Sequence, residues 1–90
     1  MLGENLIGKR VVIRAGSAGV HYGTLIEREG QEAHLQNARR IWSWQGALSL
    51  SEIAKKGLDV KASKISVPVD DIILTTVIEV LGTEKDCNLP

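Results

Sequence analysis

Two arginines and both tryptophans of this chain lie close together in the segment 39–44. The side chains of a strand point alternately to its two faces. If this segment is a strand, Arg40, Trp42 and Trp44 share one face, and Arg39 lies on the other. A guanidinium pairs with phosphate, and an indole stacks on a nucleobase. The segment therefore predicts a binding face for a flat, anionic, aromatic ligand such as a nucleotide.

The two tryptophans also have a simpler interpretation. The chain contains one Tyr and no Phe, so the indoles are among its largest apolar side chains. Large aromatic side chains are mostly buried in a core or at an interface. The sequence leaves open whether the pair lines a ligand pocket, a subunit contact or the core.

A glycine-containing turn offers further ligand groups. The segment 15–19 holds two glycines and Ser17, and a loop of this composition can direct backbone N–H groups at phosphate. Arg14 precedes the turn and His21 follows it. We expect the phosphates to be held by Arg39 and Arg40 or by Arg14, and Ser17 or His21 to supply hydrogen bonds. The Gly-Lys-Ser/Thr of a P-loop is missing, and an ordinary hairpin turn is the alternative.

Residues suited to catalysis are scattered along the chain. His21 and His34 have no third residue at metal-ligand spacing, and Asp70 and Asp71 are typical of a solvated turn after a proline. The serines lie outside any Gly-x-Ser-x-Gly motif. We therefore expect a binding protein rather than an enzyme, with neither a metal nor a cofactor.

Strands are the main elements available to position these residues. β-branched runs predict strands at 9–14, 20–28, 65–69 and 72–80, and the segment that carries Leu35 after the Gly30 turn predicts a further strand at 32–44. In chain order these are five strands. Because Pro68 cannot donate to a ladder, the fourth of these is assigned to a sheet edge. An amphipathic helix is the alternative for the last.

One short helix is predicted from Leu50 to Lys56. Ser49 and Glu52 match a capping box, in which the hydroxyl accepts from the N–H of residue 52 and the carboxylate accepts from the N–H of residue 49. Gly57 then closes the helix in the left-handed conformation.

Together these elements predict a mainly β protein. The expected fold is a small SH3-like or Sm-like antiparallel barrel of about five strands with one short inserted α-helix, in which Gly23 permits a sharp bend or a close approach of the backbone. A chain of 90 residues makes one small domain. We expect that domain to span residues 1–81 and the polar residues 82–90 to form a flexible tail.

The formal net charge is zero, with a basic excess in the first half and an acidic excess in the last third. Such a chain is not strongly attracted to DNA or membranes, so long nucleic acids are less expected as partners than small anions. The single cysteine, Cys87, cannot form an intrachain disulfide, and residues 1–7 lack a signal-peptide pattern. We expect a cytoplasmic protein with no membrane span.

Exposed apolar groups predict self-association. A small chain buries only a limited fraction of its surface. The proline-containing edge strand, together with Ile41, Trp42 and Leu48, offers apolar area to a second copy, so a homo-oligomer is expected.

Four stretches resemble a family of short proteins encoded in tailed-phage genomes. They are residues 17–20 (SAGV), 21–25 (HYGTL), 38–51 (ARRIWSWQGALSLS) and 67–74 (VPVDDIIL). The resemblance covers about residues 8–81, and the arginine–tryptophan block is its most distinctive part. The family is similar to the phage sponge proteins that sequester nucleotide immune signals made by CBASS or Thoeris defence systems.

This resemblance implies a non-enzymatic oligomer that binds a cyclic nucleotide, of the cyclic oligonucleotide or cyclic ADP-ribose type, in the host cytoplasm. It implies no particular pocket residues. The expected ligand contacts come from the chemistry above and are Arg14, Ser17, His21, Arg39, Arg40, Trp42 and Trp44. A small nucleic-acid-binding barrel and a structural or adaptor protein of the virion are the alternatives, because both would also use stacking or anchoring indoles.

Overall fold

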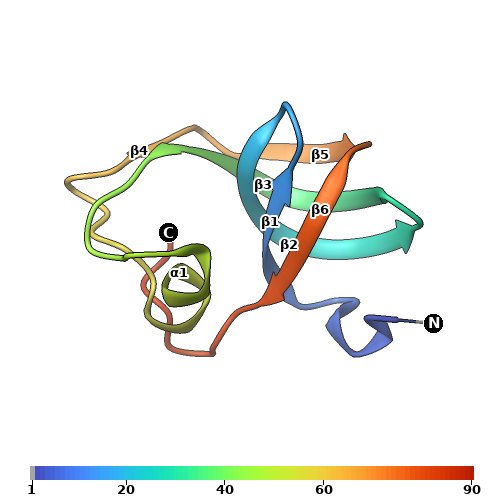
Figure 1. Cartoon of the computed structure of the whole chain (residues 1–90), viewed down its shortest axis with the longest axis horizontal. Coiled ribbons are helices and arrows are strands. Elements are labelled where there is room, and N and C mark those ends of the chain that lie inside the picture. Colours follow the sequence, from blue (N-terminus) through green and yellow to red (C-terminus); the bar gives the residue numbers. More distant parts are fainter. Residues whose placement is uncertain (1) are drawn as a thin grey trace.

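A computed structural model describes residues 2–90, so Met1, the first residue of the expected domain, lies outside it. The described chain contains a short 3₁₀ helix, six strands and one α-helix (Figure 1). Their bounds are η1 Glu4–Leu6, β1 Arg10–Ala15, β2 Gly19–Glu29, β3 Glu32–Ser43, α1 Leu50–Lys56, β4 Lys64–Ile65, β5 Val69–Leu74 and β6 Val77–Gly82. The first three strands and the helix confirm the sequence-based prediction closely.

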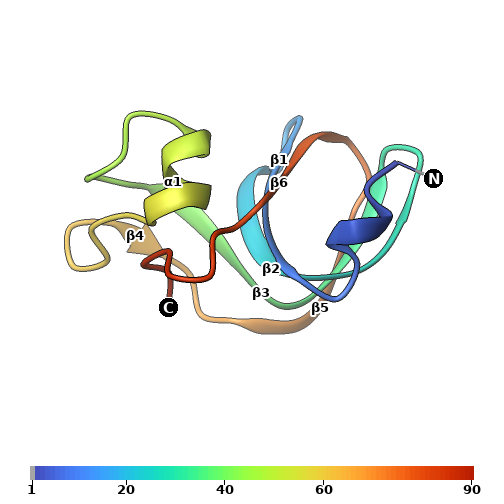
Figure 2. The ribbon, with the colours of Figure 1, turned by 90° about the horizontal axis from the view of Figure 1, so that it is seen from below.

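All strand pairs are antiparallel, in the order β4-β3-β2-β1-β6. β5 also pairs with β3, on the same edge as β4 but further along the strand, with Leu35 opposite Ile72 and Ile41 opposite Ile65. Figure 2 shows the strands curling round into an incomplete ring. The mainly β class with one helix is therefore confirmed, but the described sheet does not close into a barrel.

The prediction of a single strand over 72–80 is wrong, and so is its helical alternative. β5 ends at Leu74, and β6 begins at Val77 on the opposite edge of the sheet. The intervening turn is held by two backbone bonds, from the Gly16 N–H to the Thr76 carbonyl at 2.8 Å and from the Val77 N–H to the Gln31 carbonyl at 2.9 Å. The sequence does not indicate this turn, because its residues, Thr75 and Thr76, have high strand propensity. The turn also contains neither glycine nor proline, which are the usual turn signals.

The predicted helix is present with its expected bounds. The Ser49 hydroxyl accepts from the Glu52 N–H at 3.4 Å, as a capping box requires. The Glu52 carboxylate, however, accepts from the N–H of Leu48 at 3.2 Å and not from that of Ser49. Gly57 has a positive φ of 87° but an extended ψ of −159°, so the expected left-handed closure is wrong in detail. Within residues 2–90, no helix is long and apolar enough to cross a membrane.

Apolar residues pack on both faces of the bent sheet. Since successive strand residues face opposite ways, Val12 belongs to one face, and Val11 and Ile13 belong to the other. A helix-side cluster consists of Val12, Val20, Tyr22, Ile41, Leu50, Ile53, Ala54, Leu58, Cys87 and Leu89. The second cluster consists of Val11, Ile13, Ala15, Leu25, Ala33, Leu35, Ala38, Leu74 and Val77.

The C-terminal residues are not the free tail that their polar composition predicts. Cys87 and Leu89 are buried in the helix-side cluster. The Asn88 N–H donates to the Lys56 carbonyl at 2.8 Å, and the Tyr22 hydroxyl donates to the Pro90 carbonyl at 3.3 Å. The chain end therefore packs beside α1 at one end of the molecule (Figure 1). The sequence does not predict this packing, because the segment has only two apolar side chains that become buried and its backbone hydrogen bonds leave no pattern in the sequence.

Candidate functional site

The candidate site lies where the edge of the sheet is interrupted. β4 and β5 both pair with β3, but residues 66–68 between them belong to neither strand. The Ser66 N–H donates to the Arg40 carbonyl at 2.9 Å, and the Arg40 N–H donates to the Ser66 hydroxyl at 2.8 Å. Pro68 has no N–H to offer, and regular pairing resumes only at Val69 opposite Ala38. The interruption opens a pocket of about 220 Å³.

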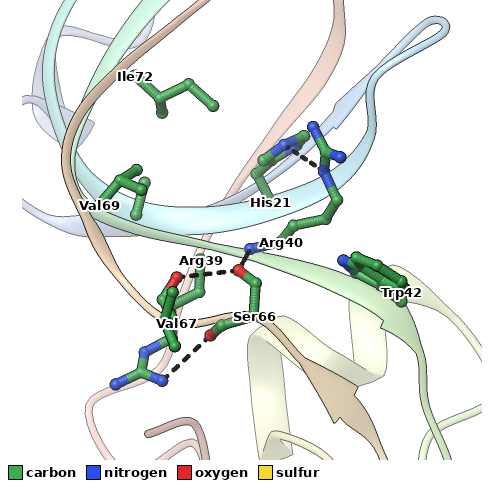
Figure 3. A pocket seen from close by; sticks show the side chains of 9 residues that line it. His21, Arg39, Arg40, Trp42, Ser66, Val67, Val69 and Ile72 are labelled. Carbon is green, nitrogen blue, oxygen red and sulfur yellow. Dashed lines mark hydrogen bonds between the residues drawn. The ribbon is translucent and has the colours of Figure 1, made fainter.

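We call this hollow the Arg40 pocket. It is lined by His21, Ala38, Arg39, Arg40, Trp42, Ser66, Val67, Val69 and Ile72. In Figure 3 the apolar side chains of Val69 and Ile72 lie on one side, and Arg40 and Trp42 lie on the other. The Trp42 side chain is unusually open for an indole, with 70% of the residue surface exposed. The pocket thus combines an apolar wall, a guanidinium and an accessible aromatic ring.

His21 holds Arg40 in place. The Arg40 Nε donates to the His21 Nε2 at 3.2 Å, as drawn in Figure 3, and only 1% of His21 is exposed. An Nε2 that accepts a hydrogen bond requires the neutral imidazole with its proton on Nδ1. The two terminal nitrogens of Arg40 have no partner among residues 2–90. They are therefore available to a ligand while the rest of the side chain is anchored.

Burial and charge keep His21 neutral. Burial lowers the pKa of the imidazole below its ordinary value of 6.5, and the positive charge of Arg40 lowers it further. The Gly19 backbone acts in the opposite direction. That opposing interaction is weak, because Nδ1 makes no hydrogen bond of ordinary geometry within the described chain. His21 is therefore a neutral acceptor at physiological pH.

This shift predicts how stability depends on pH. The unfolded chain has the higher His21 pKa and so binds more protons below pH 6.5. The stabilisation from neutral His21 is present above pH 6.5 and is lost as the pH falls towards the lower folded pKa. We expect urea denaturation to show that the free energy of unfolding falls less between pH 7.5 and pH 5.5 in His21→Gln than in the parent; the glutamine amide oxygen can still accept from Arg40. His34→Gln is the control, and its free energy of unfolding should fall as much as that of the parent. Equal falls in the parent and His21→Gln would contradict the prediction.

The structure brings together four of the seven residues predicted to bind the ligand. His21, Arg39, Arg40 and Trp42 all line the Arg40 pocket. Arg39 is already engaged, since its Nη1 donates to the Ser66 carbonyl at 3.3 Å. It lies on the same face as Tyr22, its partner across the ladder, and therefore reaches the pocket only from its rim.

The other three predicted residues lie elsewhere. Arg14 forms an exposed ion pair with Glu79 across β1 and β6, with 3.8 Å between Nε and Oε1. Ser17 is exposed in the turn between β1 and β2. Trp44 lies beyond the end of β3, where its ring packs against the helix-side cluster and its indole N–H donates to the Ala47 carbonyl at 3.2 Å. The predicted alternation stops at the strand end, so Trp42 and Trp44 have different environments.

The sequence reasoning missed one whole wall of the pocket. Ser66, Val67, Val69 and Ile72 come from the segment beside β3. The predicted edge strand at 65–69 is wrong, because Ile65 ends β4, Val69 begins β5 and residues 66–68 belong to neither strand. The signal for this break was Pro68, since a proline without an N–H interrupts a ladder. The identity of the neighbouring strand, which places the break opposite Arg40, could not be obtained from the local pattern.

Comparisons with known proteins add a family but no function. A family model described as Domain of unknown function (DUF6948) matches residues 8–88, which is most of the chain. A search of curated proteins and a search of solved structures each found no significant match.

Proposed function

We propose that this chain, which belongs to the DUF6948 family, is a non-enzymatic protein that binds and sequesters a cyclic nucleotide signal. The observation that carries the proposal is the anchored Arg40 beside the exposed Trp42 in one pocket. A guanidinium with free terminal nitrogens binds phosphate, and an accessible indole stacks on a base. The apolar wall of Val69 and Ile72 suits the remaining surface of a base or ribose.

Pre-organisation supports binding over a purely structural role for Arg40. An exposed arginine loses side-chain entropy when it pairs with an anion. The hydrogen bond from Nε to His21 has already restricted this side chain in the free protein. Less entropy is therefore lost when phosphate binds, and the affinity rises accordingly.

The pocket offers groups for binding rather than for cleavage. Its polar side chains are two guanidiniums, the Ser66 hydroxyl and the imidazole of His21. The His21 Nε2 is occupied by Arg40, and the Ser66 hydroxyl is bonded to the backbone of Arg40 and Val67. General-base catalysis needs a free basic atom within reach of the nucleophile. We therefore expect a bound cyclic nucleotide to be recovered unchanged after the protein is denatured.

Sequestration and immune evasion are the role that this chemistry best serves. A protein that only binds a signal lowers its free concentration in proportion to the protein present, and the resemblance to phage sponge proteins gives such an activity a setting in the host cytoplasm. A second copy is part of this proposal. The Arg40 pocket, at about 220 Å³, is smaller than the roughly 300–1,000 Å³ usual for small-molecule sites.

The surface around the pocket supports self-association. Val67, which lines the pocket together with Trp42, is 77% exposed, and Leu48, six residues after Trp42 in the sequence, is 92% exposed. Both offer apolar area to a second copy. Ile41, also expected there, is instead buried in the helix-side cluster. We expect light scattering at tens of micromolar to give the mass of a dimer or a larger ring. A monomer mass would contradict a pocket completed by a second copy.

Calorimetry with cyclic nucleotides tests the binding proposal. Arg40→Ala and Trp42→Ala should each weaken binding by about 1–3 kcal/mol, a loss of roughly 5- to 150-fold in affinity. Arg14→Ala is the matched control, because it removes an arginine that lies away from the pocket and pairs with Glu79. Its affinity should equal that of the parent.

Two results would count against the proposal. Equal affinity in the parent, Arg40→Ala and Trp42→Ala would exclude this pocket as the site. If no nucleotide binds to the parent, the exposed Trp42 and Val67 are better explained as anchors for another protein, as in a virion adaptor.

A further inference from the structure

A second pocket adjoins the Arg40 pocket. We call it the Lys64 pocket, and it is lined by Trp42, Ser63, Lys64, Ile65 and Ser66. Its volume is about 370 Å³. Trp42 and Ser66 line both pockets, so the same exposed indole borders two neighbouring hollows.

Each pocket contains a cation that can bind an anion. In the Arg40 pocket it is Arg40, whose two terminal nitrogens have no partner among residues 2–90, whereas one terminal nitrogen of Arg39 donates to the Ser66 carbonyl. In the Lys64 pocket it is Lys64, which has no hydrogen-bond or ion-pair partner among residues 2–90. Both pockets therefore present a positive charge next to the face or edge of an exposed indole.

The strand register separates the two cations. Lys64 is opposite Ser43, three positions beyond Arg40 on β3. At about 3.3 Å per residue, and with the register shift between Ile41 and Ser43, the backbones of the two positions are roughly 7–10 Å apart along the strand. Adjacent phosphates of a nucleoside diphosphate share a bridging oxygen, so they are not suited to two cations separated in this way. Two phosphates separated by a ribose are better matched.

We propose that the ligand occupies both pockets and is a free dinucleotide whose two phosphate groups are separated by a ribose. One phosphate binds Arg40, the other binds Lys64, and a base stacks on Trp42 where the pockets meet. This inference rests on the proposed function and goes beyond it, since it selects two linked nucleotides over a mononucleotide or a nucleoside diphosphate. It also assigns a binding role to Lys64, an exposed residue of the short edge strand β4.

Calorimetry with five defined probes tests this inference: AMP, ADP, the linear dinucleotide pApA, cyclic di-AMP and a ten-residue oligoadenylate. We expect a dinucleotide to bind at least about tenfold more tightly than AMP or ADP, because it gains a second charge-assisted contact. Lys64→Ala should weaken dinucleotide binding by about fivefold and leave AMP binding unchanged. Arg40→Ala should weaken the binding of both.

Lys61→Ala is the matched control. Lys61 is exposed, lies three residues away in the chain and lines neither pocket. It removes the same charge from the protein, so a general electrostatic effect would appear in both lysine variants. Circular dichroism should show parent-like spectra, because both side chains are exposed.

Failure of this inference can be distinguished from failure of the proposed function. If Lys64→Ala and Lys61→Ala affect dinucleotide binding equally, or if ADP binds as tightly as a dinucleotide, the two-pocket ligand is wrong. Binding of AMP that depends on Arg40 would then still support the proposed function. If a ten-residue oligoadenylate binds more tightly than either dinucleotide, the ligand is a nucleic-acid strand and the free dinucleotide is excluded. If no probe binds, this inference fails, and the proposed function then requires a cyclic nucleotide other than cyclic di-AMP.

Discussion

Replacing Gly57 with alanine is expected to lower the free energy of unfolding by about 3 kcal/mol, a large effect for one methyl group. Gly57 follows α1 and has φ 87° and ψ −159°, a region of backbone space that is essentially restricted to glycine. Its neighbour in space is Asn88, with which it forms an isolated parallel bridge. A Cβ at position 57 would collide with the backbone of Asn88.

The Asn88 backbone cannot move away freely. Its N–H donates to the Lys56 carbonyl at 2.8 Å, and its carbonyl accepts from the Leu58 N–H at 3.2 Å. Its side chain also donates to the Leu58 carbonyl at 3.0 Å. To accommodate the methyl group, the C-terminal segment must lose these bonds or the burial of Leu89.

Gly30→Ala is the control for backbone conformation alone. Gly30 also has a positive φ, of 57°, but nothing lies within 4 Å of a Cβ built there. We expect Gly30→Ala to cost about 1–2 kcal/mol, the usual penalty for a left-handed alanine. Urea denaturation measures both variants. Equal losses would show that the C-terminal residues do not pack on Gly57 in solution and would restore the prediction of a flexible tail.

The second large effect separates the two tryptophans. Trp44→Ala should lower the free energy of unfolding by about 2–3 kcal/mol, because a partly buried indole leaves the helix-side cluster and its hydrogen bond to Ala47 is lost. Trp42→Ala should change stability by no more than about 0.5 kcal/mol, because most of that side chain is exposed. Thermal and urea unfolding of both variants provide the measurement.

Fluorescence gives an independent test of the same assignment. In Trp44→Phe the remaining fluorophore is Trp42, and a stacked nucleotide should quench it. In Trp42→Phe the remaining fluorophore is Trp44, and the ligand should leave its emission nearly unchanged. Quenching of Trp44 instead, or a larger loss of stability in Trp42→Ala than in Trp44→Ala, would reverse the roles assigned to the two indoles.

Local signals in the sequence were sufficient for much of the fold. Apolar and β-branched residues bounded by glycine predicted β1, β2 and β3, and the Ser49 cap with Gly57 predicted both ends of α1. These signals depend on residues a few positions apart, which is why they can be read without knowing the rest of the chain. The grouping of Arg40 with Trp42 follows from the same strand alternation.

Tertiary structure decided what depends on residues far apart in the chain. The run 72–80 has strand propensity throughout, but the choice of β3 and β1 as partners for its two parts requires a turn at residues 75 and 76. Trp44 is separated from Trp42 by the end of β3 and by the cluster around α1. His21 became the anchor of Arg40 because the register of β2 and β3 sets them opposite each other. Local sequence therefore determined β1, β2, β3, the helix and the shared face of Arg40 and Trp42, whereas long-range pairing and packing determined the last three strands and which side chains share a pocket.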